Sequence, residues 1–460
     1  MSTGLTFKRL QELVRATHGP PSRGYLLAVG AAASLAAFGG WCYSLIVRTG
    51  LHWTGLRRPV MWGSLITDFV FWVGIAHSGT LISAILFLFR ARFRTAVYRV
   101  AEMMTVFAVM TAGLYPIFHL GRPWFAYWLL PIPNERGLWI NFKSPLIWDV
   151  FAISTYLTVS AIFLVVGMAP DAAALRDGAT GWRRRAYGLL AFGWRGTDSQ
   201  WRHYTRAYLF FAAFATPLVV SVHSVVSWDF ATSILPGWHS TLFPPYFVAG
   251  AILSGVAMVI TILIPLRRYL HLEEIITPQH IDMLARLVIL TSAILTYSYT
   301  TEIVTALRLP ASDPEHSTFV FRMTGTYWPL FWLMVVANCV GPALLLVRKI
   351  RSTTWSLLAI SLLVNVGMWL ERFNIVVTSL AHDRLPFTWR TYWPSWVEWG
   401  MTFGAFGWFF FWFLLGIKLL PSVSISEMKE EIAHDAHAHA PGGDREAALP
   451  AGAPGGLHAT

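Results

Sequence analysis

The feature that most constrains this chain is a succession of ten apolar runs, each about 20 residues long and able to cross a bilayer. They lie near residues 25–47, 63–89, 100–118, 145–168, 206–228, 245–265, 281–303, 327–347, 354–370 and 399–420. A backbone inside lipid must satisfy its hydrogen bonds internally, so runs of this kind fold as helices. With 55% apolar and 13% charged residues, the sequence predicts an all-α, polytopic membrane protein with ten transmembrane helices.

The basic residues indicate how these helices are oriented. The loops between the runs form two alternating sets, and the set that includes residues 1–24, 90–99 and 169–205 holds about twice as many Lys and Arg residues as the other. Basic loops stay in the cytoplasm, so both termini are predicted to be cytoplasmic. The net charge of +11 therefore reflects membrane topology and does not indicate a nucleic-acid partner.

Composition divides the chain into three segments. Residues 1–24 form a cytoplasmic N-terminal segment, and their length and lack of a cleavage site predict a retained first span. Residues 25–420 form the membrane domain. Residues 421–460 become polar and then rich in Ala, Gly, Pro and His, which predicts a disordered cytoplasmic tail. Its closely spaced histidines are His434, His437 and His439. A solvated tail explains them better than a metal site does.

Cysteine and histidine placement argues against a resident metal, haem or iron–sulfur cluster. The chain has two cysteines, Cys42 and Cys339, each alone within its span. A b-type haem needs two histidines at matching depth, whereas His77 and His223 lie about 21 and 8 Å below the same surface, and His119 lies at the rim. We therefore expect electrons handled here to pass to another protein.

Several ionisable residues lie inside or at the rim of the apolar runs, among them Asp68, His77, His119 and Asp149. A charge at bilayer depth costs at least about 2.5 kcal/mol, so such residues are usually functional. Counting residues from the span ends places Asp68, His119 and Asp149 in one layer near the periplasmic surface. His77 lies near the bilayer middle. The periplasmic half also holds His223, Asp229 and Glu302.

This layer could carry proton chemistry. A neutral His119 imidazole could accept a hydroxyl proton, and a carboxylate such as Asp149 would orient the ring and stabilise its cation. Each residue also has a structural interpretation: His119 could simply face water, Asp149 could favour a helix N-terminus, and Arg122 could anchor the interface. The polar residues of the spans could likewise only hold helices together. Asp68, His119 and Asp149 are predicted to lie at one depth, and this coincidence favours a functional role for them.

Three motifs carry a resemblance to a known family. They are the run 65–86 with Asp68 and His77, the sequence His119-Leu-Gly-Arg-Pro-Trp124, and the sequence Ser144-Pro-Leu-Ile-Trp-Asp149. Together they resemble the NrfD/PsrC family of membrane quinone-reacting subunits, named from polysulfide reductase. The ten-span form and the long basic loop after Asp149 most resemble the quinol-binding membrane subunit of bacterial alternative complex III.

The resemblance implies a fold, a site and partners. The fold would be two four-helix bundles with flanking helices. Menaquinol or ubiquinol would be oxidised near the periplasmic face, with His119 and Asp149 catalytic and Arg122 and Asp68 also in the pocket. Residues for proton transfer, which could extend to proton translocation across the membrane, would be His77, Asp68, His223, Asp229 and Glu302.

The implied partners would make the chain one part of a respiratory quinol:cytochrome c reductase in a bacterial inner membrane. They are c-type cytochrome subunits, a periplasmic iron–sulfur subunit, a homologous membrane subunit and a terminal oxidase. The lipid bilayer is also an expected partner.

Two other functions stay open at this stage. One is the quinone-reactive membrane subunit of a molybdopterin oxidoreductase of the polysulfide-reductase type. The other is a secondary transporter coupled to protons or cations, which would show interrupted spans in matching halves. Pro217, Pro265 and Pro342 do occur within spans, but they show no paired pattern. A purely structural membrane anchor would differ from all of these by tolerating loss of His119.

Overall fold

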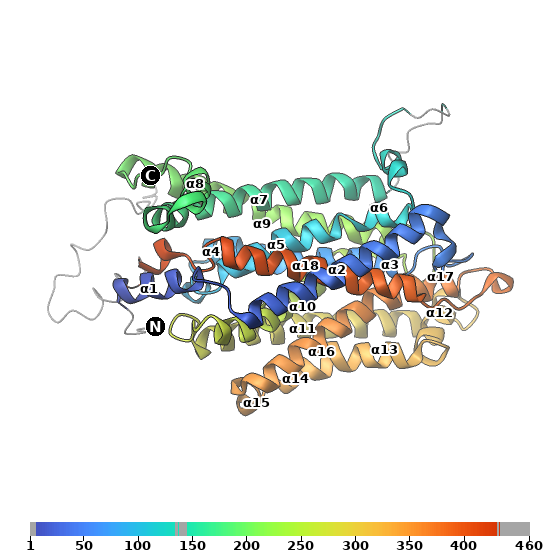
Figure 1. Ribbon diagram of the computed structural model, residues 1–460. Coiled ribbons are helices and arrows are strands. Elements are labelled where there is room, and N and C mark those ends of the chain that lie inside the picture. Colours follow the sequence, from blue (N-terminus) through green and yellow to red (C-terminus); the bar gives the residue numbers. More distant parts are fainter. Residues whose placement is uncertain (1–5, 134–136, 138–144, 430–431, 433–460) are drawn as a thin grey trace, which may run out of the picture.

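The computed structural model describes residues 6–133, 137, 145–429 and 432, and its regular elements are helices (Figure 1). The α-helices are α1 (Phe7–Thr17), α2 (Arg23–Thr49), α3 (Ser64–Thr80), α4 (Leu86–Leu88), α5 (Tyr98–Ala112), α6 (Tyr115–His119), α7 (Pro145–Gly178), α8 (Gly181–Leu190), α9 (Asp198–Ala231), α10 (Phe243–Tyr269), α11 (Pro278–Arg308), α12 (Pro314–Thr324), α13 (Trp328–Val335), α14 (Gly341–Leu344), α15 (Arg348–Ser352), α16 (Thr354–Phe373), α17 (Ser379–Ala381) and α18 (Trp396–Leu419). Short 3-10 helices are η1 (Leu51–Trp53), η3 (Arg92–Arg94), η4 (Pro123–Leu129) and η7 (Pro386–Thr388).

The predicted membrane spans are confirmed. In the described part of the chain, nine helical segments are long and apolar enough to cross a bilayer, and a bent pair of segments can supply a tenth. The bent pair replaces the predicted continuous span 327–347: α12 and the segment 328–344 meet at 82°. Gly325 ends α12 and a proline lies in the first turn of α13, so the backbone turns there.

The spans form two bundles that pack side by side (Figure 1). In the first bundle α3 packs on α5, and α7 packs on both α5 and α9. In the second, α10 packs on α11 and α16, and α13 packs on α16. Contacts between α3 and α10 join the bundles, while α2 and α18 pack along each other at the flank. This is the predicted arrangement of two four-helix bundles with flanking helices.

The helices differ in how much of their surface the protein covers. Every residue of α3 is buried, so α3 is the central helix of the molecule. In contrast α2 buries a single stripe, formed by Tyr25, Ala32, Gly39, Cys42 and Ile46. The spacing of three, four or seven residues in that stripe marks one helix face, and the remaining apolar face is left for lipid.

Small residues let α2 and α18 approach closely. A Cβ atom added at Gly39 would lie 2.6 Å from the Cα of Gly404, and one added at Gly400 would lie 2.4 Å from Sγ of Cys42. Close backbone contact of this kind replaces the hydrophobic driving force, which is absent between helices in lipid. The first and last spans are thereby fastened together.

Three spans contain a π-helical turn. These are η2 (Leu81–Ile85) between α3 and α4, η5 (Val336–Val340) between α13 and α14, and η6 (Asn374–Thr378) between α16 and α17. A π turn leaves backbone carbonyls without their usual partners and is often found at functional positions. Each of the three spans that contain these turns also carries buried polar residues.

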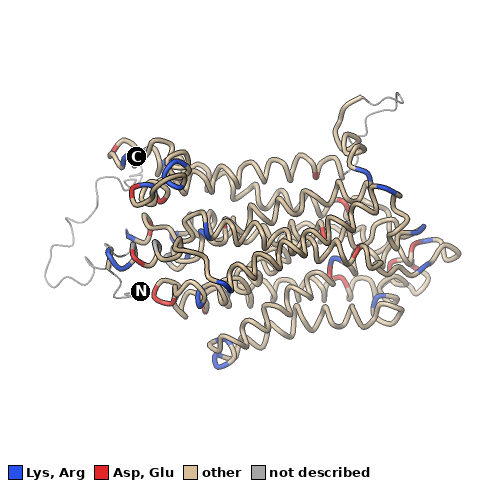
Figure 2. The backbone as a smooth tube through the Cα atoms, viewed as in Figure 1, with Lys and Arg blue, Asp and Glu red and all other residues tan. Residues whose placement is uncertain are grey.

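Charged residues gather at the two ends of the bundles (Figure 2). One end carries α1, α8 and α15, and in the predicted topology it is the cytoplasmic end. There Arg99 lies 2.9 Å from Glu102 and 3.1 Å from Asp171, all three fully buried. The groups at this end therefore neutralise one another.

The segment that follows α18 completes this cluster. Asp171 Oδ1 accepts hydrogen bonds from the backbone N–H groups of Ile425 (3.0 Å) and Ser426 (3.1 Å), and Glu427 pairs with Arg94 at 2.7 Å. This differs from the predicted disordered tail, because residues 421–425 are buried and a helical turn follows at 425–429. The histidines His434, His437 and His439, and the Ser144 motif residue, lie outside the described residues.

Candidate functional site

Two carboxyl groups from neighbouring helices lie next to each other at the end of the first bundle opposite α8, which is the periplasmic end in the predicted topology. They belong to Asp149 on α7 and Asp229 on α9. The preceding residues pack as well, with the rings of Trp148 and Trp228 6.1 Å apart. Asp149 is 2% and Asp229 5% exposed, and none of their four oxygens accepts a hydrogen bond from a described residue outside the pair. Adjacent ionised carboxyls repel, so the pair needs a shared proton or donors from a third molecule.

His119 contacts an aromatic residue that also contacts Phe230, the residue after Asp229. His119 ends α6 and is half-buried, and its Nδ1 atom has no hydrogen-bond partner among the described residues. The Trp62 ring lies 6.4 Å from the His119 ring and 6.0 Å from Phe230, the neighbour of Asp229. Trp62 therefore bridges α6 and α9, so the ends of the two helices that hold His119 and Asp229 share one aromatic wall.

These groups are hydrogen-bond acceptors, which suit a molecule that brings hydroxyl donors. The site offers four carboxyl oxygens and an imidazole nitrogen, all buried and unpartnered among described residues. Buried polar atoms are normally satisfied, and unsatisfied ones point to an absent ligand or water. A dihydroxy aromatic ring would supply O–H donors to these acceptors and a flat face for Trp62.

Arg122 and the aromatic residues after it form the outer edge of the site. The guanidinium carbon lies 5.8 Å from the Trp124 ring, and Nε has no hydrogen-bond partner among described residues. Trp124 and Phe125 on η4 and Phe151 on α7 are all exposed. An aromatic belt at this height is typical of the membrane interface. It leaves an apolar approach from the bilayer toward Asp149.

Asp68 lies in a separate, fully bonded position. One carboxyl oxygen accepts a hydrogen bond from Trp369 Nε1 at 2.7 Å, and the other accepts one from the Thr402 hydroxyl at 2.6 Å. The Tyr115 hydroxyl lies next to this carboxyl, one helical turn before His119. Asp68 thus ties α3 to α16 and α18, and Tyr115 connects it to the His119 helix.

His77 and His223 face each other in the interior of the first bundle. Their ring centroids are 4.4 Å apart, so the two histidines lie at nearly the same depth. The sequence-based placement of His77 and His223 at different depths is therefore wrong, because counting residues from the expected span ends ignores where each helix begins and how it is tilted. His77 Nδ1 lies 2.7 Å from the Val73 carbonyl and Nε2 lies 2.8 Å from the Val219 carbonyl. A neutral imidazole can donate to only one of these carbonyls, whereas a protonated ring donates to both. The His77 ring can therefore receive a proton without moving, while both nitrogens of His223 lack a partner among described residues.

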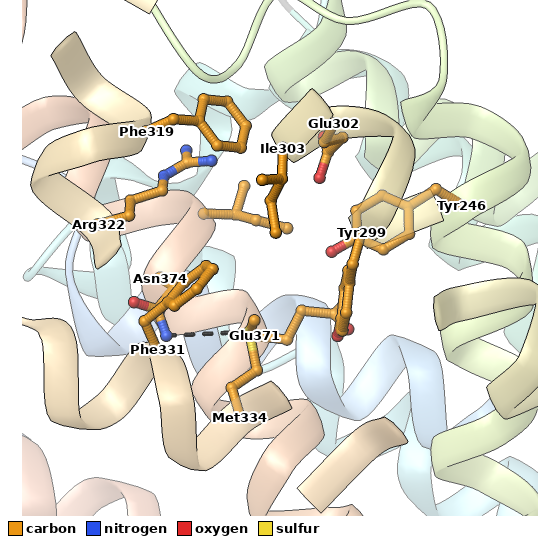
Figure 3. A pocket seen from close by; sticks show the side chains of 11 residues that line it. Tyr246, Tyr299, Glu302, Ile303, Phe319, Arg322, Phe331, Met334, Glu371 and Asn374 are labelled. Atoms are coloured by element: carbon orange, nitrogen blue, oxygen red, sulfur yellow. Dashed lines mark hydrogen bonds between the residues drawn. The ribbon is translucent and has the colours of Figure 1, made fainter. Parts of the chain in front are cut away.

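Glu302 belongs to the second bundle, far in sequence from the carboxyl pair. It lines a cavity of about 20 Å³ with Arg322, Tyr246, Tyr299 and Glu371, and Figure 3 shows their side chains around it. Tyr299 donates a hydrogen bond to Glu371, which also pairs with Arg372. A cavity of this size holds about one water. Glu302 is thus part of a second polar centre.

Some of the residues that build these sites carried no signal in the sequence. Trp62, Tyr115 and Tyr156 are ordinary aromatic residues of apolar segments until the fold places them beside His119, Asp68 and His77. Among the described residues, no three His, Cys, Asp or Glu side chains form a group that could hold a metal ion.

Fold and site define an integral, multi-pass membrane protein with buried acids and histidines in a helical bundle. The chain belongs to the NrfD polysulphide reductase family, whose model matches residues 53–382. That range includes all of the candidate residues described above.

Relatives of similar length share the membrane domain. The chain is 26% identical to a Halobacterium salinarum protein described as a membrane subunit of dimethyl sulfoxide reductase, over 79% of each chain. It is 23% identical to an Hdr-like menaquinol oxidoreductase integral membrane subunit of Archaeoglobus fulgidus, over 87% of this chain and 94% of the relative. It is 20% identical to a selenate reductase subunit of Mesobacillus selenatarsenatis, over 86% of this chain and 93% of the relative.

Proposed function

We propose that this chain is the quinol-oxidising integral membrane subunit of a multi-subunit oxidoreductase. The observation that carries the proposal is the buried pair Asp149 and Asp229, whose oxygens accept no hydrogen bond from a described residue outside the pair. Trp62 contacts both His119 and Phe230, the residue after Asp229. Family membership supports the assignment, and one relative is named as a menaquinol oxidoreductase subunit.

The proposed reaction takes two electrons and two protons from the quinol. One hydroxyl donates to the Asp149–Asp229 pair and the other to His119, so both protons have an acceptor when the electrons leave. Arg122 lies at the entrance, where it interacts with the head group. Because the chain is proposed to hold no redox centre of its own, the electrons pass to an iron–sulfur subunit docked at the periplasmic end.

The relatives favour one kind of complex over another. They are named as subunits of dimethyl sulfoxide reductase, selenate reductase and menaquinol oxidoreductase. These names support the membrane subunit of a molybdopterin-type reductase, or of a menaquinol oxidoreductase, better than they support alternative complex III. They give no support to a secondary transporter. A c-type cytochrome partner and a terminal oxidase would belong only to the alternative complex III assignment.

Proton transfer through the first bundle is a second part of the proposal. A cavity of about 10 Å³ lies between Glu102 and Thr80, and the Thr80 hydroxyl lies 2.8 Å from that of Tyr156. The Tyr156 ring lies 5.4 Å from His77, which faces His223. These groups offer a route from the cytoplasmic end toward Asp229. Asp68 and Glu302 would also transfer protons, at positions beside this route.

The quinol site is tested with the intact complex and matched acid variants. Asp149→Asn and Asp229→Asn should each lower quinol oxidation at least about 100-fold, since each removes a proton acceptor. Asp177→Asn changes an exposed acid at the opposite end of the same helix as Asp149 and should leave the rate unchanged. Rates and quinol binding are measured on complexes in which every subunit is verified to be present. Normal turnover in both site variants would overturn the assignment.

A further inference from the structure

A large cavity lies far from the carboxyl pair, at the end of the molecule that carries α1 and α8. Its volume is about 280 Å³, against about 20 and 10 Å³ for the two cavities inside the bundles. The linker between α1 and α2 forms one wall with His18 and Gly19, and the α7–α8 junction forms the other with Thr180 and Arg183. It approaches the size of a small-ligand pocket and has room for several waters or one head group.

One buried side chain on the wall lacks a partner. His18 is 8% exposed, and its Nδ1 lies 3.1 Å from the Lys418 carbonyl oxygen. The other ring nitrogen, Nε2, is buried and has no hydrogen-bond partner among the described residues. Nδ1 must carry the hydrogen that bonds the carbonyl, so Nε2 accepts in the neutral ring and donates to an anion once the ring is protonated.

The opposite wall presents the N-terminus of α8. The Thr180 side chain makes no capping hydrogen bond, so the first amide N–H groups of this ten-residue helix are left without that acceptor. Arg183 in the first turn donates from Nη1 to the His18 carbonyl at 2.9 Å and so fixes the two walls together. Free amides and the positive end of a helix dipole attract an anion.

The fixed charges around the cavity are positive. Arg183 and Lys418 both bond to backbone carbonyls, of His18 and Thr17, and neither pairs with a carboxylate among the described residues. The nearest acid along the chain, Asp177, pairs with Arg176. Burial lowers the pKa of His18, and the charges of Lys418 and Arg183 lower it further. An anion in the cavity would offset both cations and favour the protonated ring.

The position of α8 indicates where the anion comes from. Trp182, Leu189 and the adjoining Phe192 are 64%, 77% and 69% exposed. Large apolar side chains beside basic residues on a short helix are typical of a helix lying in the membrane interface. Basic pockets at the cytoplasmic ends of spans bind anionic lipid head groups. Lipid acyl chains would run along the apolar surface while the head group enters the cavity.

We propose that this cavity binds the phosphodiester head group of an anionic phospholipid, held by Arg183, the α8 amides and His18. The protonated Nε2 of His18 donates to a phosphate oxygen, and Arg183 supplies the opposite charge. The site is separate from the proposed quinol chemistry and does not depend on it. Bound lipid would add to the contacts that already join α1, α8 and the end of α18.

The test compares lipids and inorganic phosphate on the purified complex after delipidation in detergent. Phosphatidylglycerol vesicles should raise the thermal unfolding midpoint, and phosphatidylcholine vesicles should not. Arg183→Gln and His18→Gln should abolish the rise and the co-purified phosphatidylglycerol measured by mass spectrometry. Arg185→Gln, which removes an exposed charge two residues further on, should retain both.

Three outcomes would overturn the proposal. The first is an equal rise with both lipids, and the second is an unchanged rise in Arg183→Gln and His18→Gln. The third is a rise produced by inorganic phosphate with none from phosphatidylglycerol, which would identify a free anion as the ligand. If a glutamine variant fails to assemble, Arg183→Lys keeps the charge but not the guanidinium, and it should bind lipid more weakly than the unmodified complex.

Discussion

The two ends of the first bundle differ in whether their buried ionisable residues have partners of opposite charge. At the end with α1 and α8, Arg99 contacts Glu102 and Asp171, and Arg94 contacts Glu427. At the other end, Asp149 and Asp229 face each other with no cation and no donor from the described residues. A buried charge with its partner present is part of the structure, whereas an acid left without donors is held ready for another molecule. Two equally buried acids can therefore have different roles. An acid with a cation or donor beside it stabilises the structure, and an acid without one is a candidate for binding or catalysis.

The largest expected effect comes from the unpartnered end. His119→Ala should lower quinol oxidation by about 10²–10⁴-fold, because it removes a proton acceptor, while the complex still assembles. Steady-state turnover with a reduced quinone analogue measures this. His239→Ala, an exposed histidine at the same end, is the control and should retain full activity. Equal rates in the two variants would remove His119 from the site.

The paired end should respond in stability. Arg99→Ala leaves the buried carboxyls of Glu102 and Asp171 without their cation and should destabilise the protein by about 3–5 kcal/mol. Asp229→Asn removes one of two repelling carboxyls and places an amide donor beside Asp149, so it should cost little. Thermal unfolding of the purified complex distinguishes them. The contrast between the two ends would fail if Asp229→Asn lowered the midpoint as much as Arg99→Ala did.

A smaller loss of stability is expected when the segment after α18 is removed. A stop codon after Leu420 deletes Glu427 and the N–H donors to Asp171, and should cost about 1–3 kcal/mol for each buried group left unsatisfied. A stop codon after Ile432 retains all these contacts and serves as the control. Identical unfolding curves for the two truncations would show that the contacts add nothing.

The smallest effect is expected at Asp68, whose carboxyl is fully bonded. Thr402→Val removes one of its two hydrogen bonds and should destabilise the protein by about 1 kcal/mol with little change in turnover. The thermal unfolding midpoint and the turnover rate of Thr402→Val are both measured and compared with those of His119→Ala. A loss of turnover similar to that of His119→Ala would assign Asp68 to the quinol site. This would agree with the membrane depth predicted for Asp68 from the sequence.

Much of the fold could be predicted because the bilayer imposes a simple rule. A span needs about 20 apolar residues, so run lengths predicted the spans and loop charges predicted their orientation. The arrangement in two bundles was predicted only from the resemblance to a known family. The break between α12 and α13 was not predicted, because hydropathy detects apolar length and is insensitive to direction. Gly325 and the proline after Trp328 carried the signal, but neither is specific for a turn of 82°.

The site was predictable by residue type but not by partnership. Asp149 and Asp229 were both singled out, yet they were assigned to different tasks because 80 positions separate them. Only the packing of α7 on α9 brings the two carboxyls together. Likewise, nothing local distinguishes Asp68, which accepts two hydrogen bonds, from Asp149, which accepts none from described residues.

The segment after α18 was misjudged for a compositional reason. Residues 433–460 are rich in Ala, Gly, Pro and His, and they dominated the interpretation of everything beyond Pro421. The eight residues 421–428 have a different character, with Val423, Ile425 and Met428 all buried. A window that averages the whole tail hides so short a segment.

The contact between Asp171 and residues 425–426 means that the first bundle is completed only after the segment that follows α18 has been synthesised. The ribosome makes Arg94, Arg99 and Asp171 more than 250 residues before Ile425. Until then, the nascent bundle waits in the membrane with part of its charged interior uncovered. A chain that ended near residue 420 would hold every candidate membrane span and still lack the groups that pair with Asp171 and Arg94.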